Sequence, residues 1–129
     1  MNTLNTDTMK EFTIPTDIES EAVDFISSVY NTLKENQIIG EVDYAALDIL
    51  ARTYSLYIKA SRQVEKEGIT ISTESGSLKP HPAIRIVSDT QTKVLGLMKE
   101  FGLTAKSRAA IPNMEVNQTP LESFISKKK

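Results

Sequence analysis

One long segment, residues 43–67, restricts the fold more than any other part of the sequence, because it reads as a single amphipathic helix. Asp43 is a candidate cap for its start, and Gly68 is a typical stop. Apolar residues recur on it at helical spacing in two stripes. The first stripe is Leu47, Leu50, Ala51, Tyr54, Tyr57, Ile58 and Val64. The second stripe is Ala46, Ile49, Thr53, Leu56 and Ala60. A surface helix normally needs only one stripe. We therefore expect this helix to be central in a bundle, or to share a face with another subunit.

Further helices are predicted by the same three- and four-residue spacing of apolar side chains. One covers residues 17–36, with Asp17 as its candidate N-cap. Another opens at Pro80-His81-Pro82, where proline is tolerated in a first turn, and ends before Gly102. A short fourth helix is expected over residues 105–111. For His81 we expect a solvated or a capping role.

Residues 69–79 alternate β-branched and polar side chains around a turn-like stretch, which favours a short β-hairpin or an irregular loop. An isolated hairpin is marginal in water, so a hairpin here is expected to pack on something. The predicted fold class is mainly α: a small helical bundle of about four helices, with this hairpin or loop between helices two and three. We assign residues 17–111 to the bundle, residues 1–16 to a flexible N-terminal segment, and residues 112–129 to a flexible tail.

The tail carries a possible docking helix. Thr119-Pro120-Leu121-Glu122 matches a capping box with proline at the first helical position. Leu121, Phe124 and Ile125 would fall on one face of that helix. Because so short a helix is not stable alone in water, we expect it to form only when docked on a partner. A frayed tail and a tail folded back on its own domain are the alternatives.

Charge is divided unevenly along the 129 residues. The net charge is -2, yet residues 1–51 hold ten acidic and two basic side chains, and residues 52–129 hold thirteen basic and seven acidic ones. Such asymmetry is typical of nucleic-acid binding or self-association, and also of two solvated faces of opposite sign. There is no cysteine, which fits a reducing cytoplasm. We expect no signal peptide and no membrane span, since no apolar run approaches roughly 20 residues.

No enzyme chemistry is expected from the sequence. It lacks the Gly-x-x-x-x-Gly-Lys-Ser/Thr loop of ATP-hydrolysing proteins. The hydroxyl side chains lack a nucleophile motif, and the one histidine cannot by itself build a usual zinc site. We therefore expect no catalytic residue, no cofactor and no metal.

Basic side chains on two helices are the candidates for contact with nucleic acid. The candidates on the long helix share one face, because they are three and four residues apart: Lys59, Arg62 and Lys66. Lys106 and Arg108 lie in the short fourth helix, whose N-terminal N–H groups suit a phosphate. The alternatives are a solvated face partnered by Glu65 or Glu67, and a structural lock made by Arg108.

Several blocks of sequence stand in a characteristic order. They are Tyr54-Ser55-Leu56-Tyr57 leading to Lys59-Ala60, Val64-Glu65-Lys66-Glu67-Gly68, the excursion Ile71 to Gly76, Lys79-Pro80-His81-Pro82-Ala83, and Phe101-Gly102-Leu103-Thr104-Ala105-Lys106-Ser107-Arg108. This order resembles the four-helix small terminase subunits of tailed phages and prophages. That family commonly shows Gly-Leu-Thr-Pro-x-x-Arg in the last block, where this chain has Ala105 in place of proline. His81 stands where the family often has asparagine.

The resemblance implies a non-catalytic subunit that acts in the host cytoplasm, away from membranes. It implies binding of double-stranded viral DNA near the packaging start, assembly into a ring, and delivery of DNA to a large terminase subunit that carries the ATPase and nuclease. The second stripe of the long helix would then be the oligomer interface. Two other classes stay open: a small helix-turn-helix DNA-binding regulator, and an oligomeric adaptor that does not bind DNA.

Overall fold

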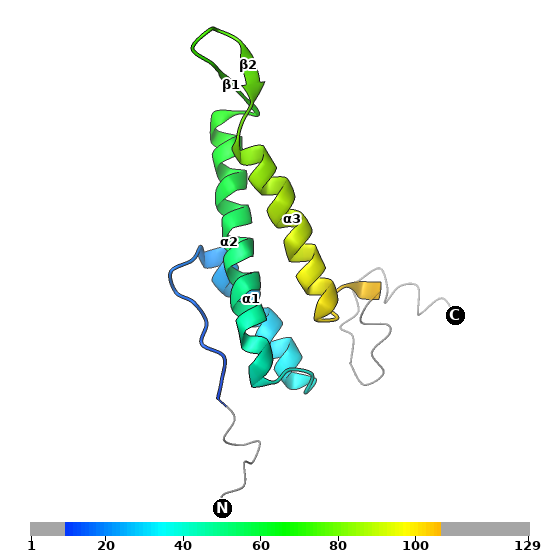
Figure 1. Cartoon of the computed structure of the whole chain (residues 1–129). Coiled ribbons are helices and arrows are strands. Elements are labelled where there is room, and N and C mark those ends of the chain that lie inside the picture. Colours follow the sequence, from blue (N-terminus) through cyan, green and yellow to red (C-terminus); the bar gives the residue numbers. More distant parts are fainter. Residues whose placement is uncertain (1–9, 107–129) are drawn as a thin grey trace, which may run out of the picture.

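Three helices, a short 3₁₀ turn and one hairpin make up residues 10–106, the part of the chain that the computed structural model describes (Figure 1). The elements are α1 (Ser20–Glu35), η2 (Glu41–Asp43), α2 (Tyr44–Glu67), β1 (Thr70–Ser72), β2 (Leu78–Pro80) and α3 (Ala83–Glu100). The mainly α class is confirmed, with a hairpin at the predicted place. A helical turn begins at Ala105, and the rest of the predicted fourth helix lies outside the described residues. A count of four helices therefore stays a prediction.

The long helix α2 is central, as one reading of its two stripes predicts. Both α1 and α3 pack along α2, and each contacts α2 far more than the two contact each other. The first stripe supplies the fully buried Leu47, Leu50 and Ala51. The core is completed from the other elements by Phe12, Ile26, Val29, Tyr30, Leu33 and Val94. Gly68 ends α2 with a φ of 89°, a backbone conformation that side chains other than glycine rarely adopt.

The start of α1 differs from the sequence prediction. Asp17 is not its N-cap: the cap position is Glu19, which makes no side-chain cap hydrogen bond. The carboxylate of Asp17 instead accepts hydrogen bonds from the guanidinium of Arg52 on α2. At the start of α1, a buried hydroxyl of α2 provides the acceptor that Asp17 does not: Ser55 Oγ accepts the N–H of Glu19 at 2.9 Å. The N–H of the cap residue is therefore satisfied across the helix pair, by a side chain of α2, while the N–H of Ala22 bonds locally to the carbonyl of Glu19.

The N-terminal segment, for which flexibility was predicted over residues 1–16, packs on the bundle from residue 10 onward. Phe12 is a core residue, and its ring lies 5.5 Å from that of Tyr30 and 5.6 Å from that of Tyr44. Tyr44 also donates its hydroxyl to the carbonyl of Lys10. Burial raises the pKa of Tyr44 to about 12. The aromatic side chain of Phe12 thus holds this N-terminal segment on the bundle, although the polar sequence of the segment shows no helical periodicity.

The hairpin stands out beyond the ends of α2 and α3 (Figure 1). Its antiparallel register pairs Thr70 with Pro80, Ile71 with Lys79 and Ser72 with Leu78. The expectation that it packs on something is wrong within the described residues: Leu78 is 69% exposed, and every strand residue except Ile71 is exposed. The hairpin is held at its base, because both strands continue into rigid helices and His81 donates its backbone N–H to the carbonyl of Ile69.

His81 anchors the junction of hairpin and helices. Its side chain is 5% exposed, so the expected solvated role is wrong and the capping role is confirmed. Nδ1 accepts the N–H of Ala83, the first residue of α3, at 3.0 Å. Nε2 lies 2.7 Å from the carboxylate of Glu67, the last residue of α2. Since Nδ1 accepts, Nε2 carries the proton and donates it to Glu67. This hydrogen bond lowers the pKa of the Glu67 carboxyl.

Replacing this histidine tests the anchor. We expect His81→Ala to lower the free energy of unfolding by about 1–3 kcal/mol, because the first N–H of α3 loses its acceptor and a buried site is emptied. His81→Asn keeps a side-chain acceptor for that N–H and should lose less. Urea denaturation followed by circular dichroism gives both values. Glu65→Gln, an exposed carboxylate near the end of α2, is the matched control. Equal stability of His81→Ala and the control would contradict the anchoring role.

Candidate nucleic-acid interface

The predicted basic face of α2 exists, but its members differ in what they contact. Lys59, Arg62 and Lys66 are all exposed. Within residues 10–106, Lys59 and Lys66 form no ion pair, whereas Arg62 forms two. The two lysines are therefore placed to meet a phosphate group, and Arg62 is already occupied.

Arg62 joins α2 to the start of α1. Its Nη1 lies 3.4 Å from the carboxylate of Glu19, and its Nη2 pairs with the carboxylate of Glu21. The alternative weighed from the sequence was a face partnered by Glu65 or Glu67, and the partners are instead these two residues of the other helix. Arg62 thus serves the packing of α1 on α2 in this structure, which leaves Lys59 and Lys66 as the phosphate candidates on this face.

A second arginine of α2 extends the same ionic seam. Arg52 binds Asp17 at 3.1 Å and Asp48 at 3.0 Å. The hydrogen bond from Arg52 lowers the pKa of the Asp17 carboxyl, and the same bond raises the pKa of Arg52. Lys59 lies between Arg52 and Arg62 along α2. Part of the charge asymmetry of the sequence is therefore used inside one chain, because acidic residues near the N-terminus partner the basic residues of α2.

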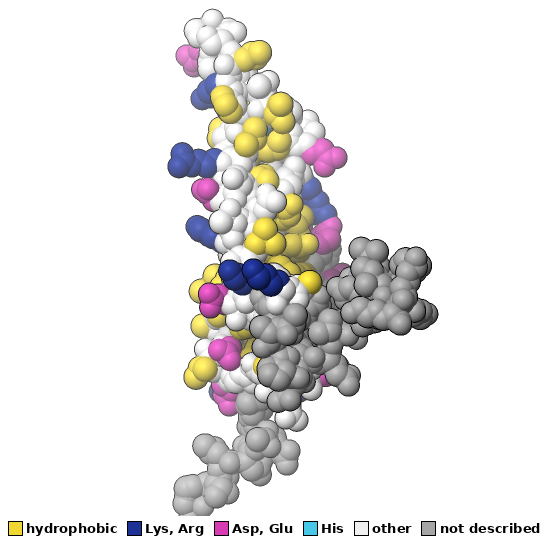
Figure 2. Space-filling model, turned by 90° about the vertical axis from the view of Figure 1, so that its right-hand side faces the viewer, with side chains coloured by type: hydrophobic (Ala, Val, Ile, Leu, Met, Phe, Trp, Pro, Cys, Tyr) yellow, Lys and Arg dark blue, Asp and Glu magenta, His cyan; other side chains and the backbone are white. Residues whose placement is uncertain are grey.

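Other exposed basic residues come from the hairpin and α3, and the sequence reasoning missed them. Lys79 lies on β2, and Arg85 and Lys93 lie on α3. Arg85 approaches Asp89 only at 3.9 Å, and its side chain is 89% exposed. Figure 2 shows the face that carries α3, with lysine and arginine side chains gathered mainly along one edge beside a strip of hydrophobic ones. A sequence signal for Arg85 and Lys93 was available, because the two residues are eight positions apart, a step that leaves both on the outer side of a helix.

The predicted phosphate contacts of the fourth helix are only partly described. Lys106 is exposed at the start of the helical turn that follows Thr104. Arg108 lies outside the described residues, as do Leu121, Phe124 and Ile125 of the tail.

The residues of the predicted oligomer interface differ in their exposure. Ile49 is 57% exposed and Leu56 is 47% exposed, and Ala46 and Thr53 are half-buried. Ala60 does not belong with them, since it is 4% exposed. The physical reason is that α1 and α3 both pack along α2, so residues of one stripe on α2 differ in how far they are covered. What remains uncovered on this side of α2 is a narrower apolar strip centred on Ile49 and Leu56.

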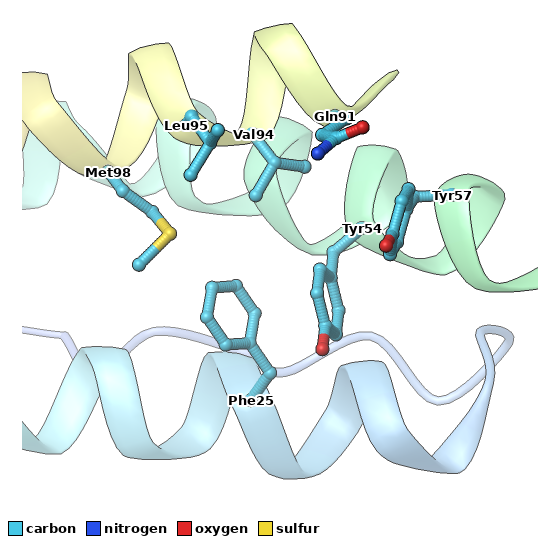
Figure 3. Close-up of a pocket in the computed structure, with 7 residues that line it drawn as sticks. All are labelled: Phe25, Tyr54, Tyr57, Gln91, Val94, Leu95 and Met98. Carbon is cyan, nitrogen blue, oxygen red and sulfur yellow. The ribbon is translucent and has the colours of Figure 1, made fainter. Parts of the chain in front are cut away.

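A separate apolar groove lies between α1 and α3, with α2 as its floor (Figure 3). It has a volume of about 340 Å³ and is lined by Phe25, Tyr54, Tyr57, Gln91, Val94, Leu95 and Met98. Phe25 points into it from α1, while Leu95 and Met98 point into it from α3. The rings of Phe25 and Tyr54 stack with centroids 4.3 Å apart. The sequence reasoning did not predict this groove, because it arises from the spacing of three helices.

Two absences were found in the region from residue 10 to residue 106. No group of three or more histidine, cysteine, aspartate or glutamate side chains is placed to hold a metal ion. No helix in that region has the length and apolar character needed to cross a membrane.

Comparison with known proteins identifies the family. A family model described as phage terminase, small subunit, matches residues 27–117, which is more than half of the chain. No significant match was found among curated proteins or among solved structures. The matched range contains α2, the hairpin and α3, which hold the sequence blocks that carry the resemblance, and the resemblance is thereby confirmed. The chain belongs to the family of phage terminase small subunits, whose role is in phage DNA packaging.

Proposed function

We propose that this subunit assembles into a ring in the host cytoplasm, binds viral DNA near the packaging start, and delivers it to the large subunit that carries the ATPase and nuclease. The observation that carries the proposal is the apolar strip left on the central helix, where Ile49 is 57% and Leu56 47% exposed. Contiguous exposed apolar surface commonly marks a protein–protein interface. The small subunit is generally the non-catalytic component, and we assign it no cofactor.

Contact with DNA is assigned to weak basic sites that act together. Lys59 and Lys66 supply phosphate contacts from α2, and Lys106 and Arg108 supply them from the start of the fourth helix. Each set is small, and the chain as a whole carries a net charge of -2. A ring presents every set many times, and linked binding sites can exceed the affinity of one site by orders of magnitude. Repetition therefore reconciles a slightly acidic subunit with DNA binding.

The salt dependence of DNA binding tests this assignment. The double variant Lys59→Ala, Lys66→Ala should bind a duplex of random sequence more weakly. It should also give a shallower slope of log affinity against log salt concentration, by about 0.9 for each phosphate that the variant no longer neutralises. Fluorescence anisotropy of a labelled duplex over a salt series measures the slope.

The control for that experiment is Lys34→Ala, which removes a lysine that already pairs with Glu11 at 2.8 Å. The control should keep the original slope. A chain with no affinity for duplexes at low salt would contradict the DNA-binding proposal, and an unchanged slope in the double variant would remove Lys59 and Lys66 from it.

The tail is assigned to the large subunit. We propose that Leu121, Phe124 and Ile125 form the apolar face of a short helix that docks there. This assignment draws on the capping box at Thr119 and on the instability of so short a helix in isolation.

A further inference from the structure

The groove between α1 and α3 is an apolar surface that the described chain leaves open. It exists because α1 and α3 both pack on α2 and make little contact with each other. Leu95 on its α3 side is 53% exposed, and Phe25, Tyr54, Tyr57 and Met98 are only half-buried. A volume of about 340 Å³ is within the range of pockets that bind ligands.

The groove continues toward the point where the described chain ends. A smaller hollow of about 180 Å³ shares Phe25 and Met98 with the groove and is also lined by Ser28, Val29, Thr32 and Leu103. Leu103 lies three residues before Lys106, the last described residue. The described chain therefore ends within three residues of this extension of the groove, and 23 more residues follow in the sequence.

The segment after Lys106 has the length needed to return along the groove. Residues 107–118 precede the capping box, and at about 3.3 Å per residue they span up to roughly 40 Å. Between Met98 and Gln91, α3 rises only about 10 Å, at 1.5 Å per residue. A tethered segment this close has an effective concentration in the millimolar range, so even a small apolar contact suffices to hold it.

The chemistry of the tail matches the groove. Leu121, Phe124 and Ile125 share one helical face, and an apolar groove between two helices is a common receptor for such a face. The tail ends in three lysines, residues 127–129. The α1 wall carries Glu35 on the same helical face as Ser28 and Thr32, and Asp24 and Glu35 are both exposed. Charges of opposite sign therefore flank the two apolar faces.

We propose that the groove between α1 and α3 binds the C-terminal segment of the same chain, residues 119–129, through Leu121, Phe124 and Ile125. The apolar face of the tail, which the proposed function assigns to the large subunit, is then buried in the groove. The tail therefore cannot bind the groove and the large subunit at the same time. In the free subunit the tail occupies the groove. The groove proposal does not depend on DNA binding or on ring formation.

A spin label on the tail tests the proposal in the full chain. The protein has no cysteine, so Ser126→Cys, on the polar side of the tail helix, gives one labelling site. Methyl-labelled methionine provides four signals, of which Met98 reports from inside the groove. We expect a nitroxide at residue 126 to broaden the Met98 methyl signal, and reduction of the nitroxide to restore it.

Two variants with a matched control locate the contact. Phe124→Asp in the labelled chain should abolish the broadening, whereas Ser123→Asp, the same charge on the polar side, should leave it. Leu95→Asp on the groove side should abolish it too, and Thr92→Asp on the outer side of α3 should not. Because Phe124 lies in the tail, its variant keeps the test valid even if Leu95→Asp fails to fold.

A mixed sample identifies the chain that supplies the tail. Spin-labelled protein without isotope is mixed with isotope-labelled protein without the nitroxide. An unbroadened Met98 signal in the mixture supports docking within one chain, and a broadened signal overturns it in favour of a neighbouring copy. An unbroadened Met98 signal in the chain that carries both the nitroxide and the labelled methionine overturns the proposal altogether. That result does not affect the experiments on DNA binding and ring assembly.

Discussion

Replacing Ile49 and Leu56 together with aspartate should leave a folded subunit that no longer assembles. Both side chains are about half exposed in the single chain, so the substitutions disturb little of its own core. In an assembled ring their exposed half would be buried, which contributes roughly half of the full-burial value, about 0.8–1.5 kcal/mol for each side chain. Loss of this burial at both positions weakens each interface by about 10- to 100-fold, since 1.4 kcal/mol is tenfold, and the two carboxylates put in their place weaken it further because they would have to be buried without partners.

Light scattering coupled to size-exclusion chromatography over a concentration series measures this result. Thr92→Asp, on the outer side of α3, is the matched control and should assemble like the original chain. Circular dichroism shows whether the double variant keeps its helices. Assembly of the double variant at the original concentration would place the interface elsewhere. A monomeric original chain would remove the ring from the proposed function.

Truncating Ile26 to alanine should lower the free energy of unfolding by about 2–5 kcal/mol. Ile26 lies on α1 with no exposed surface and packs in the same core as Leu47 and Leu50 of α2. Its removal leaves a cavity between the two helices that the packed core cannot fully close. Since natural domains are stable by only about 5–15 kcal/mol, the variant should unfold at a clearly lower urea concentration.

The control for this measurement is Leu78→Ala on the hairpin. Leu78 is 69% exposed, so its truncation should cost less than about 1 kcal/mol. A loss for Leu78→Ala as large as that for Ile26→Ala would contradict the exposed hairpin and show that its strand packs on something. Denaturation at several protein concentrations separates burial within the chain from burial between copies.

Local sequence signals predicted the elements well. The spacing of apolar residues and Gly68 predicted α2 to its last residue, because helix periodicity and a glycine stop act over a few neighbouring positions. The alternation after Ile69 and the prolines around His81 predicted the hairpin and the start of α3. The order of these blocks identified the family, and its match confirms that reading.

The sequence reasoning failed where a residue finds its partner far along the chain. Phe12 gave no periodic signal, yet it packs against Tyr30 and Tyr44. Asp17 has the chemistry of an N-cap, but Arg52 offers its carboxylate a charged partner. For the candidate site, spacing alone placed three basic residues on one face of α2. Of these three, Arg62 forms ion pairs with α1, whereas Lys59 and Lys66 form none with the residues described.

By itself the sequence determined which stretches of the described chain are helical, where α2 ends and where α3 begins, and to which family the chain belongs, since these depend on neighbours in the chain. Only the tertiary structure decided that Ala60 is buried while Ile49 and Leu56 stay exposed, that Arg62 is occupied by α1, and that a groove separates α1 from α3. Burial, pairing and hollow space are set by how helices pack on one another, and the residues of one helix do not specify the position of the next.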